Sequence, residues 1–201
     1  MKQKGFTLVE ISIVLGVILI LTAILIPFIE KNVRDAKIAR ALSDSREIAK
    51  AIIEARKDLG KWPIEDSTPT HSTCRVLVGT KPTVITSSIP SADPSCGSAC
   101  DWNKTPAETI YYEIVSPSNH YPKFNPNPYN YPSWNGPYIN DTKPDPWGKA
   151  FLVNSAYLEN GPDADNTRIV FVISGGPDNL MDTPFNGTQE LSGDDIGFRI
   201  R

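Results

Sequence analysis

A nearly unbroken apolar segment at residues 6–29 constrains this 201-residue chain more than any other feature of its sequence. At about 1.5 Å per residue, a helix of this length reaches roughly 36 Å, which is enough to cross the hydrocarbon core of a bilayer. No small-residue cleavage site follows the segment, and the sequence continues instead as a polar, helix-forming stretch. Lys2 and Lys4 precede it and predict a cytoplasmic N-terminus. We therefore predict one membrane-spanning helix at the inner membrane, with a periplasmic head.

Glu10 is the one charged residue inside this apolar segment. A lone carboxylate is costly at membrane depth, and a buried carboxylate needs a partner or a proton. The segment contains no Lys, Arg or His that could pair with it. Two interpretations remain open: the side chain reaches water near the helix end, or its partner comes from another subunit.

The sequence around Glu10, KGFTLVEI at residues 4–11, resembles the leader junction of type IV prepilins. In that family a membrane peptidase cuts after the glycine, the new N-terminal phenylalanine is N-methylated, and the glutamate neutralises the N-terminal amine of a neighbouring subunit. The resemblance implies a leader at residues 1–5 and cleavage between Gly5 and Phe6 by a prepilin peptidase/methyltransferase. It further implies methylation of Phe6, and it makes Glu10 the assembly carboxylate of a homo-polymer.

Residues 30–60 continue the helix with an amphipathic pattern that predicts packing on the head. Apolar or small residues recur at three- and four-residue steps, namely Ile38, Leu42, Ser45, Ala49, Ile52 and Leu59. Gly60 and Pro63 are typical of a helix end. Pro27 lies within the apolar part, where a proline kinks or locally melts a helix.

Residues 61–135 are rich in Pro, Ser, Thr and Asn, and we expect them to form an irregular insertion. Short structured pieces are expected at residues 74–78 and 109–115, the second with mixed helix and strand signals. The segment holds all three cysteines, Cys74, Cys96 and Cys100. Outside the cytoplasm a disulfide is expected, either between Cys74 and one of the others or between Cys96 and Cys100, because connectivity does not follow from sequence.

The last third, residues 136–201, is typical of a β-sheet head with a C-terminal acidic loop. Residues 150–153 and 169–173 are rich in β-branched and aromatic side chains, and glycine–proline–aspartate turns separate such segments. We predict an α+β fold: a long N-terminal helical spine, transmembrane in its first half, packed on a small antiparallel β-sheet head.

A second resemblance is to the major pseudopilins of type II secretion systems. It rests on GPYI at 136–139, PDPWG at 144–148, GKWP at 60–63, SGGPD at 174–178 and DDIG at 194–197. In that family the C-terminal loop binds calcium, and the resemblance implies Asp178, Asp194 and Asp195 as ligands, with Asp182 a weaker candidate. The alternative is that these aspartates only cap turns. The segment between Asp178 and Asp194 is longer and poorer in glycine than the family's usual loop.

No enzyme motif accompanies these features, and the two histidines stand in low-complexity surroundings. The formal net charge is −3 without a basic stripe, which argues against nucleic acid as a partner. The sequence therefore predicts a filament subunit of a secretion pseudopilus, with an inner-membrane assembly platform and minor pseudopilins as partners. The alternatives are a type IV pilin or minor pseudopilin for adhesion, motility or DNA uptake, and a membrane-anchored periplasmic binding protein that never polymerises.

Overall fold

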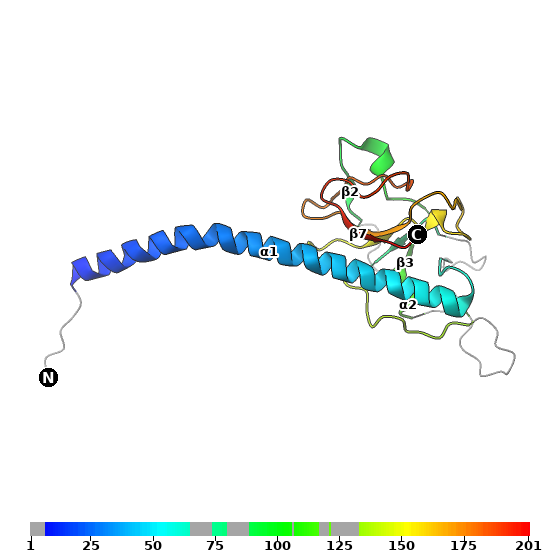
Figure 1. Cartoon of the computed structure of the whole chain (residues 1–201), viewed down its shortest axis with the longest axis horizontal. Helices are drawn as coiled ribbons and strands as arrows, with labels where there is room; N and C mark the ends of the chain where they lie inside the picture. The colour runs from blue at the N-terminus through cyan, green and yellow to red at the C-terminus, as the bar shows by residue number, and fades with distance from the viewer. Residues whose placement is uncertain (1–6, 65–73, 80–88, 106, 117–120, 122–132) are drawn as a thin grey trace. The chain divides into compact units, whose positions relative to one another are not determined.

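The computed structural model describes residues 7–64, 74–79, 89–105, 107–116, 121 and 133–201 (Figure 1). The chain divides into two compact units, Met1–Ala39 and Arg40–Arg201. The proposed cleavage site between Gly5 and Phe6 lies outside the described residues.

The described part of the first unit is helical from Leu8, where helix α1 (Leu8–Leu59) begins. Its large apolar side chains are exposed as far as Val33, and the helix is long and apolar enough to cross a membrane by length and composition. The helix continues through Pro27, so local melting, one of the two outcomes expected there, does not occur in the single subunit. Proline has no backbone N–H, and α1 therefore gives up one hydrogen bond at this position while keeping its helical course.

In the second unit, the C-terminal part of α1 buries a stripe of small and apolar side chains. The buried residues are Ala41, Ser45, Ile48, Ala49, Ala51, Ile52, Ala55 and Leu59. Four alanines in this stripe lack side chains beyond Cβ, which brings the helix backbone close to its neighbours. The helix ends as predicted at Gly60, which has φ 68° and donates its N–H to the Arg56 carbonyl at 2.9 Å. Positive φ at the end of a helix favours glycine because it has no Cβ.

The head is built on a five-stranded sheet with the order β3-β1-β4-β5-β7. These strands are β1 (Val76–Val78), β3 (Ala107–Thr109), β4 (Leu152–Val153), β5 (Phe171–Ser174) and β7 (Ile196–Arg199). The α+β class is confirmed, but the sheet is mixed rather than antiparallel, because β1 and β3 pair in parallel. Both of these strands come from residues 61–135, so this segment contributes two strands to the sheet as well as irregular chain.

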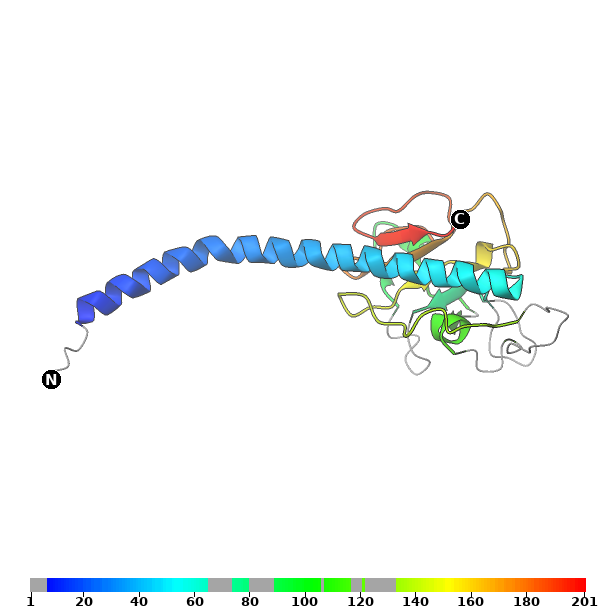
Figure 2. The ribbon, with the colours of Figure 1, turned by 60° about the horizontal axis from the view of Figure 1, so that its bottom comes forward.

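Successive side chains of a strand point to opposite faces of the sheet. Neighbouring residues of these strands therefore pack in two different cores, one on each face. On β5, Val172 packs in the same core as Ile52 of α1, whereas Phe171 and Ile173 pack in a second core on the other face. Trp102 lies in this second core. The sheet is thus covered on both faces, by α1 on one (Figure 2) and by loop segments on the other.

Short elements complete the head. Strands β2 (Ser91–Ala92) and β6 (Leu180–Met181) pair in parallel, and η2 (Gly97–Cys100) follows β2. Helix α2 (Ile110–Ile114) starts directly after β3, and Thr109 is both the last residue of β3 and the N-cap of α2. This explains the mixed helix and strand signals of residues 109–115. The short helix η3 (Ser155–Tyr157) follows β4.

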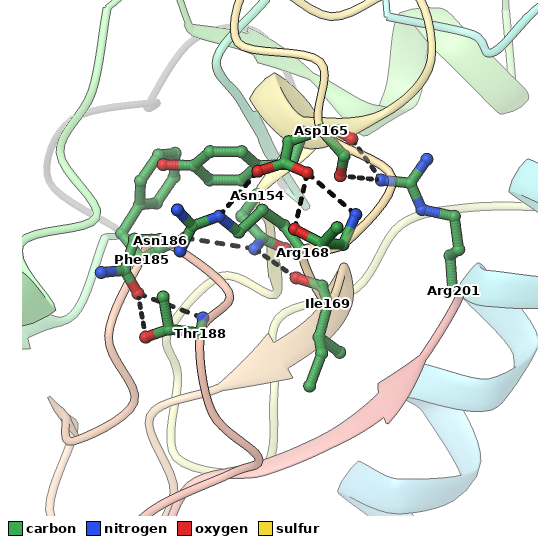
Figure 3. A network of polar contacts seen from close by, with 10 residues as sticks. Asn154, Asp165, Arg168, Ile169, Phe185, Asn186, Thr188 and Arg201 are labelled. Atoms are coloured by element: carbon green, nitrogen blue, oxygen red, sulfur yellow. Dashed lines mark hydrogen bonds and ion pairs between the residues drawn. The ribbon is translucent and has the colours of Figure 1, made fainter.

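A polar network holds the C-terminal residue against the turn that follows η3 (Figure 3). The Arg201 guanidinium donates to the carbonyl oxygens of Tyr157 and Asp165 and to Oδ1 of Asn166. Asp165 in turn accepts hydrogen bonds from Thr167 and Arg168, and those from the Thr167 hydroxyl and backbone contribute most to lowering its pKa to about 2. The end of the chain is therefore fixed beside the sheet.

Candidate functional site

The N-terminal candidate site contains a reciprocal pair of hydrogen bonds between Thr7 and Glu10. The Thr7 N–H and hydroxyl each donate to Glu10 Oε2 at 2.8 Å, and the Glu10 N–H lies 3.3 Å from Thr7 Oγ1. This is a capping box, in which two otherwise unpaired backbone donors of a helix N-terminus are satisfied by side chains. Sequence reasoning missed it, although the signal, a threonine three residues before a glutamate at a helix start, is present in the chain.

The capping box shows how the subunit can accommodate Glu10 by itself. One carboxylate oxygen, Oε2, is held by the residue that would be second in the processed chain. The other oxygen, Oε1, has no hydrogen bond among the described residues, and it remains available to a donor from outside the helix. The Glu10 carboxylate therefore has a hydrogen-bond partner within its own helix and does not depend on water for one. Its Oε1 can still accept a hydrogen bond from a neighbouring subunit.

The second candidate site is an acidic cluster in the C-terminal loop. One carboxylate oxygen from each of Asp178, Asp182 and Asp194 lies within 4.8 Å of the others. No ion pair in the described part of the chain involves any of these three side chains. Burial, and then the negative charges of Asp178 and Asp182, raise the pKa of Asp194. The loop thus brings carboxylates together without a cationic side chain of its own.

Asp195, predicted as a ligand, has a different environment from the cluster. Its Oδ2 accepts the backbone N–H groups of Asp182 at 3.0 Å and Thr183 at 2.7 Å. Its Oδ1 is buried without a hydrogen-bond partner in the part of the chain that the structure describes. Burial is the main cause that raises the pKa of Asp195 to about 7. The structure thus places Asp182, the weaker candidate, together with Asp178 and Asp194, while Asp195 accepts hydrogen bonds from the backbone at Asp182 and Thr183.

The donor set of the cluster fits a hard divalent cation. Calcium takes about six to eight oxygen ligands, and three carboxylates leave positions for carbonyl groups and water. Gly193 makes the close approach of the Asp182 side chain possible: it has φ +61°, and an added Cβ would lie 1.7 Å from Asp182 Oδ2. Asp178, Asp182 and Asp194 are accordingly the residues that could hold calcium.

The cysteines are divided between the two cores of the head. Cys96 and Cys100 form a disulfide with their Cα atoms 5.7 Å apart. Cys74 is buried outside this disulfide, and its carbonyl accepts a hydrogen bond from the Ser155 hydroxyl at 3.0 Å. The sequence left several cysteine pairings open, and the structure has the pairing of Cys96 with Cys100, which closes the shortest loop.

Comparison with known proteins gives one finding, and it concerns the N-terminus. Residues 1–26 match the family model described as the prokaryotic N-terminal methylation motif. No match was found among curated proteins or among solved structures. The matched segment contains Gly5, Phe6 and Glu10, and the motif implies processing by a prepilin peptidase and pilin-type polymerisation. The motif and the exposed apolar helix that follows it support a type IV pilin-like prepilin, a structural protein with an N-terminal membrane anchor.

Proposed function

We propose that this chain is the repeating subunit of a type II secretion pseudopilus, which polymerises through its N-terminal helix and drives protein export. Polymerisation is supported by the methylation motif and by the exposed apolar surface of α1. Secretion, as opposed to a pilus function, is supported by one observation: three aspartates gather in the C-terminal loop, where the resemblance to major pseudopilins places calcium.

The assembly step follows from the chemistry at the N-terminus. Cleavage after Gly5 would create a cationic amine on Phe6, and an amine in an apolar filament core requires an anion. Glu10 of the next subunit supplies that anion through Oε1, while Oε2 stays with its own Thr7. Each added subunit thereby gains a charge-assisted hydrogen bond, and its apolar helix surface packs against other helices instead of lipid.

A genetic experiment in the native host distinguishes this proposal from its alternatives. Deleting the gene is expected to abolish export of secreted proteins and to leave surface pili, adhesion and motility unchanged. Loss of pili with normal export would instead indicate a type IV pilin. A cysteine placed on the exposed face of α1, for example at Val17, should give a ladder of cross-linked multimers in isolated membranes. If the deletion leaves both export and pili normal, and cross-linking gives only monomer, the chain would be a membrane-anchored binding protein.

Calcium has a specific part in this proposal. When bound, it supplies the positive charge that the acidic cluster lacks and offsets repulsion among the carboxylates. The side chains of Asp178, Asp182 and Asp194 would provide the protein ligands, and Gly193 leaves room for Asp182. Calcium would then link residues near both ends of the loop that joins β5 to β7, just before the last strand of the sheet begins.

We expect the melting temperature of the full chain in detergent to be higher in calcium than in chelator. A ligand that binds only the folded state stabilises it by RT ln(1 + [L]/Kd), so the melting temperature should rise with the logarithm of calcium concentration. Magnesium should substitute poorly, because it demands tighter octahedral geometry. Differential scanning fluorimetry measures both effects.

Asp182→Asn should erase most of the calcium effect. Glu190→Gln is the matched control, because Glu190 belongs to the same loop but pairs with Arg199 instead of joining the cluster. This control should keep the full calcium response. Identical melting curves of the unaltered chain in calcium and in chelator would leave the aspartates as turn caps.

A further inference from the structure

The second core of the head joins two loop segments that are far apart in sequence. We call residues 91–102 the clamp segment and residues 180–185 the acidic-loop base, from which Asp182 projects. Both lie on the face of the sheet opposite α1, where Cys100, Trp102, Met181 and Phe185 are buried together. The clamp segment belongs to the region that the sequence marks as an irregular insertion, so its role in the head is not evident from the sequence.

Backbone hydrogen bonds connect the two segments near both ends of the acidic-loop base. Strand β2 pairs with β6, and the Asp93 N–H donates to the Met181 carbonyl at 3.0 Å. Further along, the Phe185 N–H donates to the Ala99 carbonyl at 2.9 Å. The acidic-loop base is therefore held at both of its ends by the clamp segment.

Two side chains of the clamp segment contact the middle of the base. The Trp102 indole N–H donates to the buried Thr183 carbonyl at 2.8 Å, and its ring meets Phe185 edge to face at a centroid distance of 5.3 Å. Sγ of Cys100 lies 3.0 Å from the Asp182 carbonyl oxygen. A disulfide sulfur has no hydrogen to donate, so this second contact is close packing. The two carbonyls that flank the Thr183 Cα atom, those of Asp182 and Thr183, are thus both covered.

The disulfide constrains the turn at residues 96–100 within the clamp segment. It spans only four positions in sequence, so it constrains the unfolded chain less than a long-range bridge would, and its main effect is local. It closes the η2 turn and fixes Cys100 in a fully buried position, two residues before Trp102. Without the bridge, the turn that presents the Ala99 carbonyl and the Trp102 indole would lose its covalent constraint.

We propose that the Cys96–Cys100 disulfide and Trp102 are positioning residues for the acidic loop. They hold residues 180–185 from one side while Asp195 holds the Asp182 and Thr183 N–H groups from the other. The Asp182 backbone is consequently fixed between two supports, and its carboxylate is kept beside Asp178 and Asp194. The consequence for calcium rests on the proposed function, whereas the clamping of residues 180–185 does not.

Amide hydrogen exchange of the full chain in detergent and chelator tests the clamp directly. In Cys96→Ala with Cys100→Ala, the amides of Asp182, Thr183 and Phe185 should exchange about tenfold faster than in the unaltered chain, which corresponds to losing roughly one buried hydrogen bond. Amides of β4 and β5 should keep their protection, because their pairing does not involve the clamp segment. Trp102→Phe keeps an aromatic ring but removes the indole donor, and it should accelerate exchange at the same three amides.

Trp134→Phe provides a matched control. Trp134 also donates its indole N–H to a backbone carbonyl, that of Glu113 at 3.3 Å, but it lies in the core beside α1. This variant should leave exchange of residues 180–185 unchanged. Rates within twofold of the unaltered chain in Trp102→Phe would overturn the proposal. So would equal acceleration in β5 and in the acidic-loop base, because it would indicate general destabilisation.

Repeating the hydrogen-exchange experiment with added calcium distinguishes the effect of the clamp contacts from the effect of calcium binding. The unaltered chain should show slower exchange at residues 182 and 183 in calcium than in chelator, and both clamp variants should require at least threefold more calcium for the same protection. If calcium changes nothing in the unaltered chain while the clamp variants still exchange faster, the calcium proposal fails and the clamp stands. If calcium protects all proteins at the same concentration, the disulfide and Trp102 do not position the ligands.

Discussion

Replacing Glu10 with valine is expected to abolish filament assembly while leaving membrane insertion intact. The variant removes the one charged side chain of the apolar segment, so insertion should proceed at least as well as before. It also removes the anion that would pair with the N-terminal amine of the neighbouring subunit. An unpaired charge in an apolar environment costs roughly 3–5 kcal/mol, and filament yield should therefore fall by well over tenfold. Yield is measured by shearing, sedimentation and electron microscopy.

Ser12→Ala is the matched control for this variant. Ser12 lies in the same part of α1, and its hydroxyl donates to the Leu8 carbonyl at 2.8 Å, so the substitution also removes a polar group from the apolar segment. It leaves the carboxylate in place and should assemble normally. Filaments of Glu10→Val at ordinary yield would show that assembly does not depend on the Glu10 carboxylate.

Ile52→Ala should destabilise the head by about 2–5 kcal/mol, because it leaves a cavity between α1 and the sheet. Ile52 is fully buried in the core that contains Val172 and Phe151. Ile53 follows it in the chain and is only partly buried. Ile53→Ala removes the same atoms and should therefore lower the free energy of unfolding by less. Denaturant unfolding followed by tryptophan fluorescence compares the two. Equal destabilisation by both variants would contradict the packing described here.

Much of the spine could be predicted because its signals are local. The apolar segment, the amphipathic residues that follow and the end of the helix at Gly60 each depend on neighbours within a few positions. Pro27 was the exception, since a proline weakens a helix without necessarily ending it when the surrounding residues favour the helical state. The Thr7–Glu10 capping box was equally local, and it could have been recognised from the spacing alone.

The sheet was less predictable because strand pairing depends on residues distant in sequence. Residues 76–78 and 107–109 are short and separated by irregular chain, and nothing in either segment specifies parallel pairing with the other. Thr109 illustrates the difficulty at a single position, since it ends a strand and caps a helix. The contribution of the cysteine-containing segment to the second core was hidden for the same reason.

The acidic loop shows a similar limit at the level of side chains. Asp194 and Asp195 are adjacent in sequence and look equivalent as ligands. In the structure Asp194 faces Asp178 and Asp182, whereas Asp195 turns to the backbone of Asp182 and Thr183. Sequence identifies the acidic composition of such a loop, but the assignment of each carboxylate depends on how the loop folds.

The mass of the intact mature protein, isolated from the membrane of its own host, tests the central claim most directly. Processing of a type IV pilin-like prepilin predicts a chain that lacks residues 1–5 and begins at Phe6 with one added methyl group on its amine, as the methylation motif at residues 1–26 implies. Fragmentation of the N-terminal peptide locates the methyl group. A mature chain that still begins at Met1, or one cut beyond Ile29 at the end of the apolar segment, would contradict the account.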